Sequence, residues 1–81
     1  MYMGKEVRQD IRLNNASDVH EFVKLADACD FDVNIGYGRV QIDGKSIMGV
    51  MGLDLGKVLT VHYTGDNDAM DQFVARHAIA K

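Results

Sequence analysis

The chain has 81 residues, of which 47% are hydrophobic, and a formal net charge of −3. This length predicts one domain, residues 1–81, with a single core, and the apolar content excludes a disordered chain. The negative charge and the scattered basic residues argue against nucleic-acid binding, and no apolar run is long enough to cross a membrane. A single cysteine, Cys29, and the lack of a signal-peptide pattern favour a cytoplasmic protein.

The first half of the chain predicts a strand, a helix and a hairpin. Residues 5–13 alternate as a strand, although Gln9 interrupts the inward row. Residues 14–17 form a turn rich in helix-capping side chains, and residues 18–29 then take up a helical period. Its apolar positions are Val19, Phe22, Val23 and Ala26. Residues 31–35 and 40–42 alternate on either side of a glycine-rich reversal, which is typical of a hairpin.

The second half predicts a short helix over residues 46–53, a strand over residues 57–63 and a last helix from about Asp68. The order is therefore β-α-β-β-α-β-α. Amphipathic helices joined to alternating strands favour an antiparallel sheet with helices on one face. We therefore predict an α+β open-faced sandwich, with a four-stranded antiparallel sheet and three helices on one face.

The most informative stretch is residues 44–53, GKSIMGVMGL. Ser46 is placed to cap a short helix, and at 100° per residue Ile47, Met48 and Met51 fall on one side of it. Val50 and Leu53 fall on another side. Because only one side of a surface helix can face its own core, the first group would be available to a partner, a role that suits flexible methionine. The alternative interpretation is a short, fully buried helix.

Residues 45–53 look almost residue for residue like the regulatory serine segment of HPr, the histidine phosphocarrier family of the bacterial sugar phosphotransferase system. Residues 22–24 resemble the middle of that family's first helix, and the turn at residues 53–56 also fits the family spacing. The resemblance spans essentially the whole chain and implies the same open-faced sandwich. It also implies that Ser46 is the target of an ATP-dependent kinase, and that phosphoserine there tunes binding to other proteins.

The resemblance fails at the family's phosphoacceptor. Counting back from residues 22–24, the family's histidine falls on Asn15, its arginine on Ser17 and the following proline on Asp18. Asparagine cannot form the phosphoramidate, serine brings no positive charge, and Asp18 would repel an incoming phosphate. We therefore expect the usual phosphohistidine step to be absent. A known variant of the family also lacks the histidine, keeps the serine and acts in catabolite control.

The chain's other histidines do not supply a replacement site. His20 is expected on the solvated face of the first helix, His62 on the last strand opposite Val61, and His77 near the end of the final helix. These spacings form no metal motif, and no carboxylate pair or nucleophile signature is present. We therefore expect no enzyme activity, no metal and no cofactor.

The leading hypothesis is a non-enzymatic regulatory protein that docks other proteins through Ile47, Met48 and Met51, with Ser46 as a phosphorylation switch. Its partners would be a serine kinase, a transcriptional regulator or phosphotransferase-system components, and the chain itself would be a monomer or a weak dimer. One alternative is a phosphocarrier with an unusual acceptor such as His20. Another is a module that binds a small anion at residues 14–17. In the plainest interpretation Ser46 is only a helix cap, worth about 1 kcal/mol.

Overall fold

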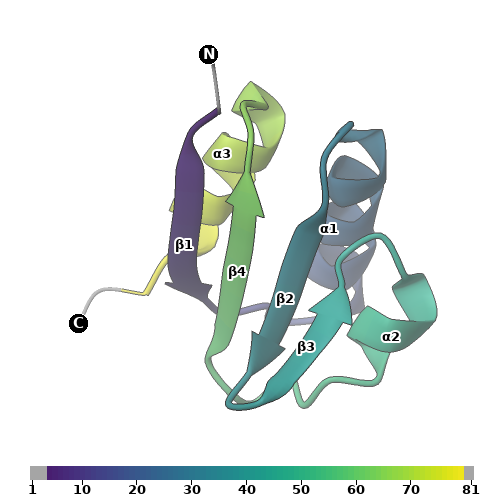
Figure 1. Cartoon of the computed structure of the whole chain (residues 1–81). Coiled ribbons are helices and arrows are strands. Elements are labelled where there is room, and N and C mark those ends of the chain that lie inside the picture. The colour runs from purple at the N-terminus through teal and green to yellow at the C-terminus, as the bar shows by residue number, and fades with distance from the viewer. Residues whose placement is uncertain (1–3, 80–81) are drawn as a thin grey trace.

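The computed structural model describes residues 4–79. Its elements are β1 (Glu6–Ile11), α1 (Ala16–Ala28), β2 (Val33–Tyr37), β3 (Val40–Asp43), α2 (Ile47–Met51), β4 (Leu59–Thr64) and α3 (Asp68–His77). The strands form one antiparallel sheet in the order β1-β4-β2-β3. In Figure 1, α1 and α3 lie behind the sheet and α2 lies beside β3. This is the predicted α+β open-faced sandwich. Within residues 4–79, no helix is both long and apolar enough to cross a membrane.

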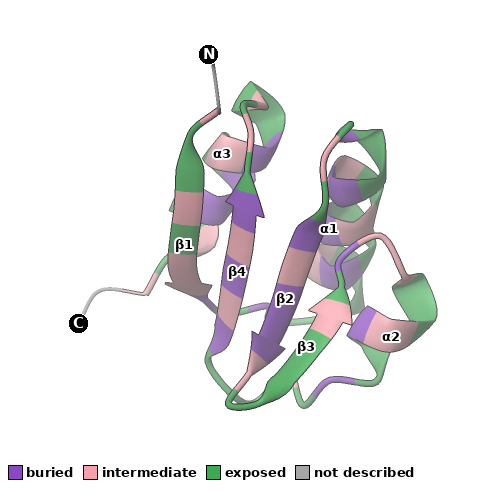
Figure 2. Cartoon of the chain, in the orientation of Figure 1, coloured by how far each residue is buried: buried purple, intermediate pink, exposed green. Residues whose placement is uncertain are grey.

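The core lies between the sheet and the helices, because alternate residues of each strand point to opposite faces. Val33 pairs with Tyr63 and Ile35 with Val61, and all four side chains are buried on the helix side. Gln9 pairs with Val61 on the same side and is half-buried, so the predicted interruption of the inward row is confirmed. The opposite sheet face is polar, and Figure 2 shows the resulting alternation along β2 and β4.

Several boundaries differ from those expected. Helix α1 begins at Ala16, earlier than predicted, because Asn15 is the residue that caps it. Strand β1 ends at Ile11, although Leu13 beyond it is fully buried. Strand β2 begins at Val33, and Phe31 before it stacks on Tyr63 with the ring centroids 5.5 Å apart. An apolar pattern can therefore continue past the end of the hydrogen-bonded ladder, since burial requires only side-chain contact.

The hairpin also closes later than expected. Gly36 belongs to β2, and the reversal lies at residues 38–39, with Gly38 at φ +57°. A Cβ at Gly36 would lie 1.8 Å from the carbonyl oxygen of Val40. Glycine is therefore required at residue 36 by the close approach of β3, and at residue 38 by the left-handed backbone of the turn.

Candidate functional site

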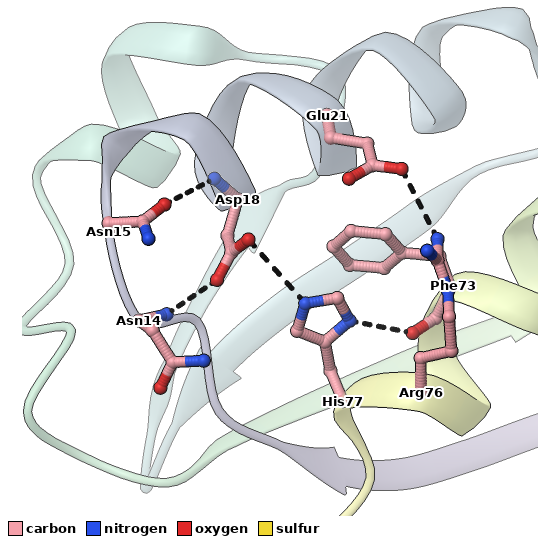
Figure 3. A network of polar contacts seen from close by, with 7 residues as sticks. All are labelled: Asn14, Asn15, Asp18, Glu21, Phe73, Arg76 and His77. Carbon is pink, nitrogen blue, oxygen red and sulfur yellow. Dashed lines mark hydrogen bonds and ion pairs between the residues drawn. The ribbon is translucent and has the colours of Figure 1, made fainter.

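The entrance of α1 is closed by its own side chains (Figure 3). Asn15 is the N-cap residue, and its Oδ1 accepts a hydrogen bond from the N–H of Asp18 at 2.9 Å. Asp18 reaches back in turn, and its Oδ2 accepts from the N–H of Asn14 at 2.9 Å. The pair works like a capping box, except that the carboxylate reaches the residue before the cap. A carboxylate therefore lies at the positive end of the helix dipole.

The same carboxylate is joined to the end of α3. Asp18 Oδ1 lies 3.6 Å from His77 Nε2, and both side chains are largely buried. The other ring nitrogen, Nδ1, lies 2.9 Å from the carbonyl oxygen of Phe73. Since a carbonyl can only accept, Nδ1 donates this hydrogen bond. The ring also stacks on the Phe73 ring with the centroids 4.1 Å apart.

The nearest arginine from α3 is engaged as well. Arg76 Nη2 donates to Glu21 Oε2 of α1 at 3.2 Å, so this guanidinium is neutralised by a carboxylate of the helix it faces. Ser17, at the position where the resemblance places an arginine, is exposed. The described entrance of α1 thus combines a neutral amide, a hydroxyl and a partly buried carboxylate, a set that is poor at holding a phosphate.

The other two histidines lie where the sequence predicts. His20 is exposed on α1. His62 lies on the polar face of the sheet, opposite the side of Val61, and its Nε2 is 2.9 Å from Glu6 Oε2 of β1. The structure does not place His20 or His62 in one site with the capping residues at the entrance of α1.

The second candidate region is α2, which has one buried and one exposed side. Val50 is fully buried and Leu53 is 7% exposed, whereas Met48 is 84%, Met51 47% and Ile47 37% exposed. We call Ile47, Met48 and Met51 the α2 patch. The predicted division of the helix into two sides is confirmed, and the alternative of a fully buried helix is wrong. Exposed apolar groups on a small protein are typical of a surface that meets another molecule.

Ser46 caps this helix at the border of the patch. Its Oγ accepts from the N–H of Gly49 at 3.2 Å, and its own N–H donates to the carbonyl of Asp43 at 3.0 Å. The neighbouring Lys45 points elsewhere: its Nζ donates to the carbonyl oxygen of Cys29 at 3.0 Å, at the C-terminal end of α1. Lys45 therefore stabilises the end of α1 by hydrogen bond and by charge, and holds α2 against it.

A third polar cluster joins the start of β1 to α3. Tyr63 Oη donates a short hydrogen bond to Asp71, and Lys5 Nζ lies 2.7 Å from the other carboxylate oxygen. Burial acts to raise the pKa of Asp71, but the hydrogen bonds from Lys5 and Tyr63 outweigh it, and the pKa lies below its ordinary value. Burial, followed by the hydrogen bond to Asp71, raises the pKa of Tyr63 well above 10. This cluster is structural and lies apart from α2.

Sequence reasoning missed the contacts from His77 to Asp18 and from Lys45 to Cys29. Both join residues that are distant in the chain, and no local pattern predicts which helix ends will meet. A histidine near the end of an amphipathic helix is explained locally by the dipole alone. The sequence likewise shows Lys45 only as the neighbour of Ser46 and does not indicate its contact with Cys29.

Comparison with known proteins agrees with the fold and with the resemblance to the HPr family. Residues 7–78 match the PTS-HPr family, under the description "PTS HPr component phosphorylation site". No curated protein and no solved structure matches the chain significantly. Proteins of this family are phosphocarriers rather than enzymes, and they interact with other proteins of the phosphotransferase system. Because the match extends over nearly all of its 81 residues, this chain belongs to the HPr family of the phosphotransferase system.

Proposed function

We propose that this HPr-like protein is a regulator that acts in the cytoplasm through protein contacts, with the α2 patch as its docking surface. The observation that carries the proposal is Met48, which is 84% exposed on a helix whose opposite side enters the core. A polar residue in place of so exposed a methionine would not lower the folding stability. A partner that buries the methionine would gain about 2 kcal/mol. Family membership supports partners that are proteins of the phosphotransferase system.

We infer that the phosphohistidine step is absent. The N-cap of α1, where the resemblance places the phosphoacceptor, is Asn15, and its side-chain oxygen is engaged with the N–H of Asp18. An amide nitrogen is delocalised into its carbonyl and is not a nucleophile. The carboxylate of Asp18 adds a second obstacle, since it occupies the electropositive end of the helix with a negative charge of its own. Two independent features therefore oppose phosphoryl transfer at this position.

Ser46 is proposed as the switch on the docking surface. A phosphate there adds a charge of about −1.5 to −2 beside Ile47, at the edge of the α2 patch. That charge would raise the desolvation cost of burying the patch against an apolar partner, and favour a partner that presents arginine or lysine. The partners proposed are an ATP-dependent serine kinase, which recognises the patch in order to reach Ser46, and a transcriptional regulator that binds the phosphorylated form.

The docking surface is tested by Met48→Asp, with Ala69→Asp as its matched control. Ala69 is also exposed, but it lies on α3, which contacts β1 at the opposite edge of the sheet from α2. Both variants should melt within a few degrees of the parent chain. Binding to the serine kinase, measured by calorimetry with purified proteins, should be lost only in Met48→Asp. Equal binding by all three chains would exclude the α2 patch.

A further inference from the structure

The pairing of β1 with β4 shows which backbone N–H and C=O groups of β1 point toward β4 and which point to the outer edge of the sheet. Gly65 donates its N–H to the carbonyl of Lys5, so Lys5 is a residue whose backbone groups point toward β4. Neighbouring residues in an antiparallel strand point their N–H and C=O groups to alternate sides. Val7 and Gln9 therefore bond to β4, whereas the backbone groups of Glu6 and Arg8 point away from it.

Residues 77–79 pair with the outer edge of the chain at residues 10–12, at the C-terminal end of β1. Arg12 donates to the carbonyl of His77, and Ile79 donates to the carbonyl of Asp10, as expected of an antiparallel bridge between Ile11 and Ala78. At the other end Gly4 takes φ +80°, which is outside the extended backbone conformation of a strand. Among the described residues, Lys5 and the part of β1 from Glu6 to Gln9 have no strand on their outer side.

We propose that this edge pairs with the same edge of a second copy, antiparallel and centred on Val7, to give a sheet that is continuous across both copies. In this register Glu6 of each copy lies opposite Arg8 of the other. Because both residues point their backbone groups outward, each such pair exchanges both of its N–H···O=C hydrogen bonds. The two-fold axis at Val7 makes the contact self-complementary, as a closed dimer requires.

The side chains favour this register on both faces of the sheet. On the polar face, the carboxylate of Glu6 meets the guanidinium of Arg8 of the second copy, and the reverse contact follows by symmetry. Both side chains are exposed, and His62 lies 2.9 Å from Glu6, so each carboxylate would lie between a guanidinium of the second copy and the His62 ring of its own. On the helix face Val7 meets Val7, and beside it lies an open hollow of about 320 Å³ lined in part by Val74 and Ala75 of α3.

Other registers are less favourable. A shift by two residues that centres the contact on Arg8 itself brings the two guanidiniums face to face, and like charges directly opposite are destabilising. A shift toward the C-terminal half of β1 meets the backbone of Ile79, which already bonds to Asp10. The charge pattern favours the register centred on Val7, and so do the limits of the free edge at Gly4 and at the bridge to residues 77–79.

The test is a charge exchange, followed by sedimentation equilibrium over a concentration series that reaches the millimolar range. Arg8→Glu places glutamates opposite each other, and Glu6→Arg places arginines opposite each other, so each single variant should dimerise at least about tenfold more weakly. The double variant Glu6→Arg/Arg8→Glu restores opposite charges at both contacts and should recover the parent association constant. Circular dichroism melting of each variant confirms that the monomer is folded.

The backbone contribution is tested by Arg8→Pro. Because the N–H of Arg8 points away from β4, proline there removes a bond to the second copy and none within the sheet, so the chain should fold and remain monomeric. Met48→Asp separates the two exposed surfaces and should leave dimerisation unchanged. A parent chain that is monomeric throughout the series would overturn the proposal. So would a dimer that survives both single charge variants, or one that Met48→Asp abolishes.

Discussion

Asp18 and His77 join the beginning of α1 to the end of α3, with 3.6 Å between the carboxylate Oδ1 and the ring Nε2. The contact places a carboxylate of the chain itself at the helix entrance, beside a histidine ring from a distant helix (Figure 3). A helix N-terminus favours negative charge, and here that preference is satisfied within the molecule. The entrance of α1 thus has a structural role that does not depend on a phosphate.

Asp18→Asn should destabilise the fold. The substitution removes the charge from the dipole and from His77 while keeping an oxygen that can accept from Asn14. We expect a loss of about 1 kcal/mol in the free energy of unfolding, or about 4–8 °C in Tm. Asp27→Asn, at an exposed position near the other end of α1, is the control and should change Tm by much less. Equal effects of the two changes would mean that the entrance carboxylate has no special role.

Two substitutions at Ser46 separate its capping role from the effect of a negative charge at this position. Ser46→Ala removes the acceptor for the N–H of Gly49 and should cost about 1 kcal/mol in chemical denaturation. Ser46→Asp keeps a capping oxygen and adds a negative charge, so it should retain the parent stability and still change binding at the α2 patch. If the aspartate variant bound every partner of the parent chain with unchanged affinity, a charge switch at Ser46 would be excluded.

Stability should fall in acid through Asp71. The pKa of this carboxyl is below its ordinary value of 3.8 in the folded chain, so its contribution is fully present above that value. The contribution is lost as the pH falls through the lower, folded pKa, because only the ionised form accepts from both Lys5 and Tyr63. Asp71→Asn should therefore flatten the decline in Tm below about pH 4. An unchanged pH profile in this variant would assign the acid sensitivity to other carboxyls.

A graft at the entrance of α1 tests why the phosphohistidine step is absent. Asn15→His alone supplies a ring nitrogen but leaves the carboxylate of Asp18 in place, so we expect little phosphate transfer from phosphoenolpyruvate and the family's upstream enzyme. Asn15→His/Ser17→Arg/Asp18→Pro adds a cation and removes the anion, and should accept phosphate more readily. Acid-labile phosphate, measured by mass spectrometry without acid treatment, reports the difference. Equal labelling of the two variants would show that Asp18 is no obstacle.

The fold could be predicted because each element carries its own period. Alternation of Val33 and Ile35, the helical spacing from Val19 to Ala26, and the two-sided character of α2 are all local, and the structure reproduces them. Element ends were less accurate, since Asn15 and Ser17 are both good caps and only packing decides between them. The contacts of His77 and Lys45 could not be predicted, because they depend on which helix ends meet in three dimensions.

Whether phosphate is carried by Ser46 or by a histidine is tested most directly by mass spectrometry of the purified chain. One sample is incubated with ATP and the family's serine kinase, and the other with phosphoenolpyruvate and the upstream carrier enzyme. We predict phosphate on Ser46 in the first sample and none in the second, with Ser46→Ala as the blank. Phosphate on His20 or on any other histidine in the second sample would contradict the account and restore a carrier role.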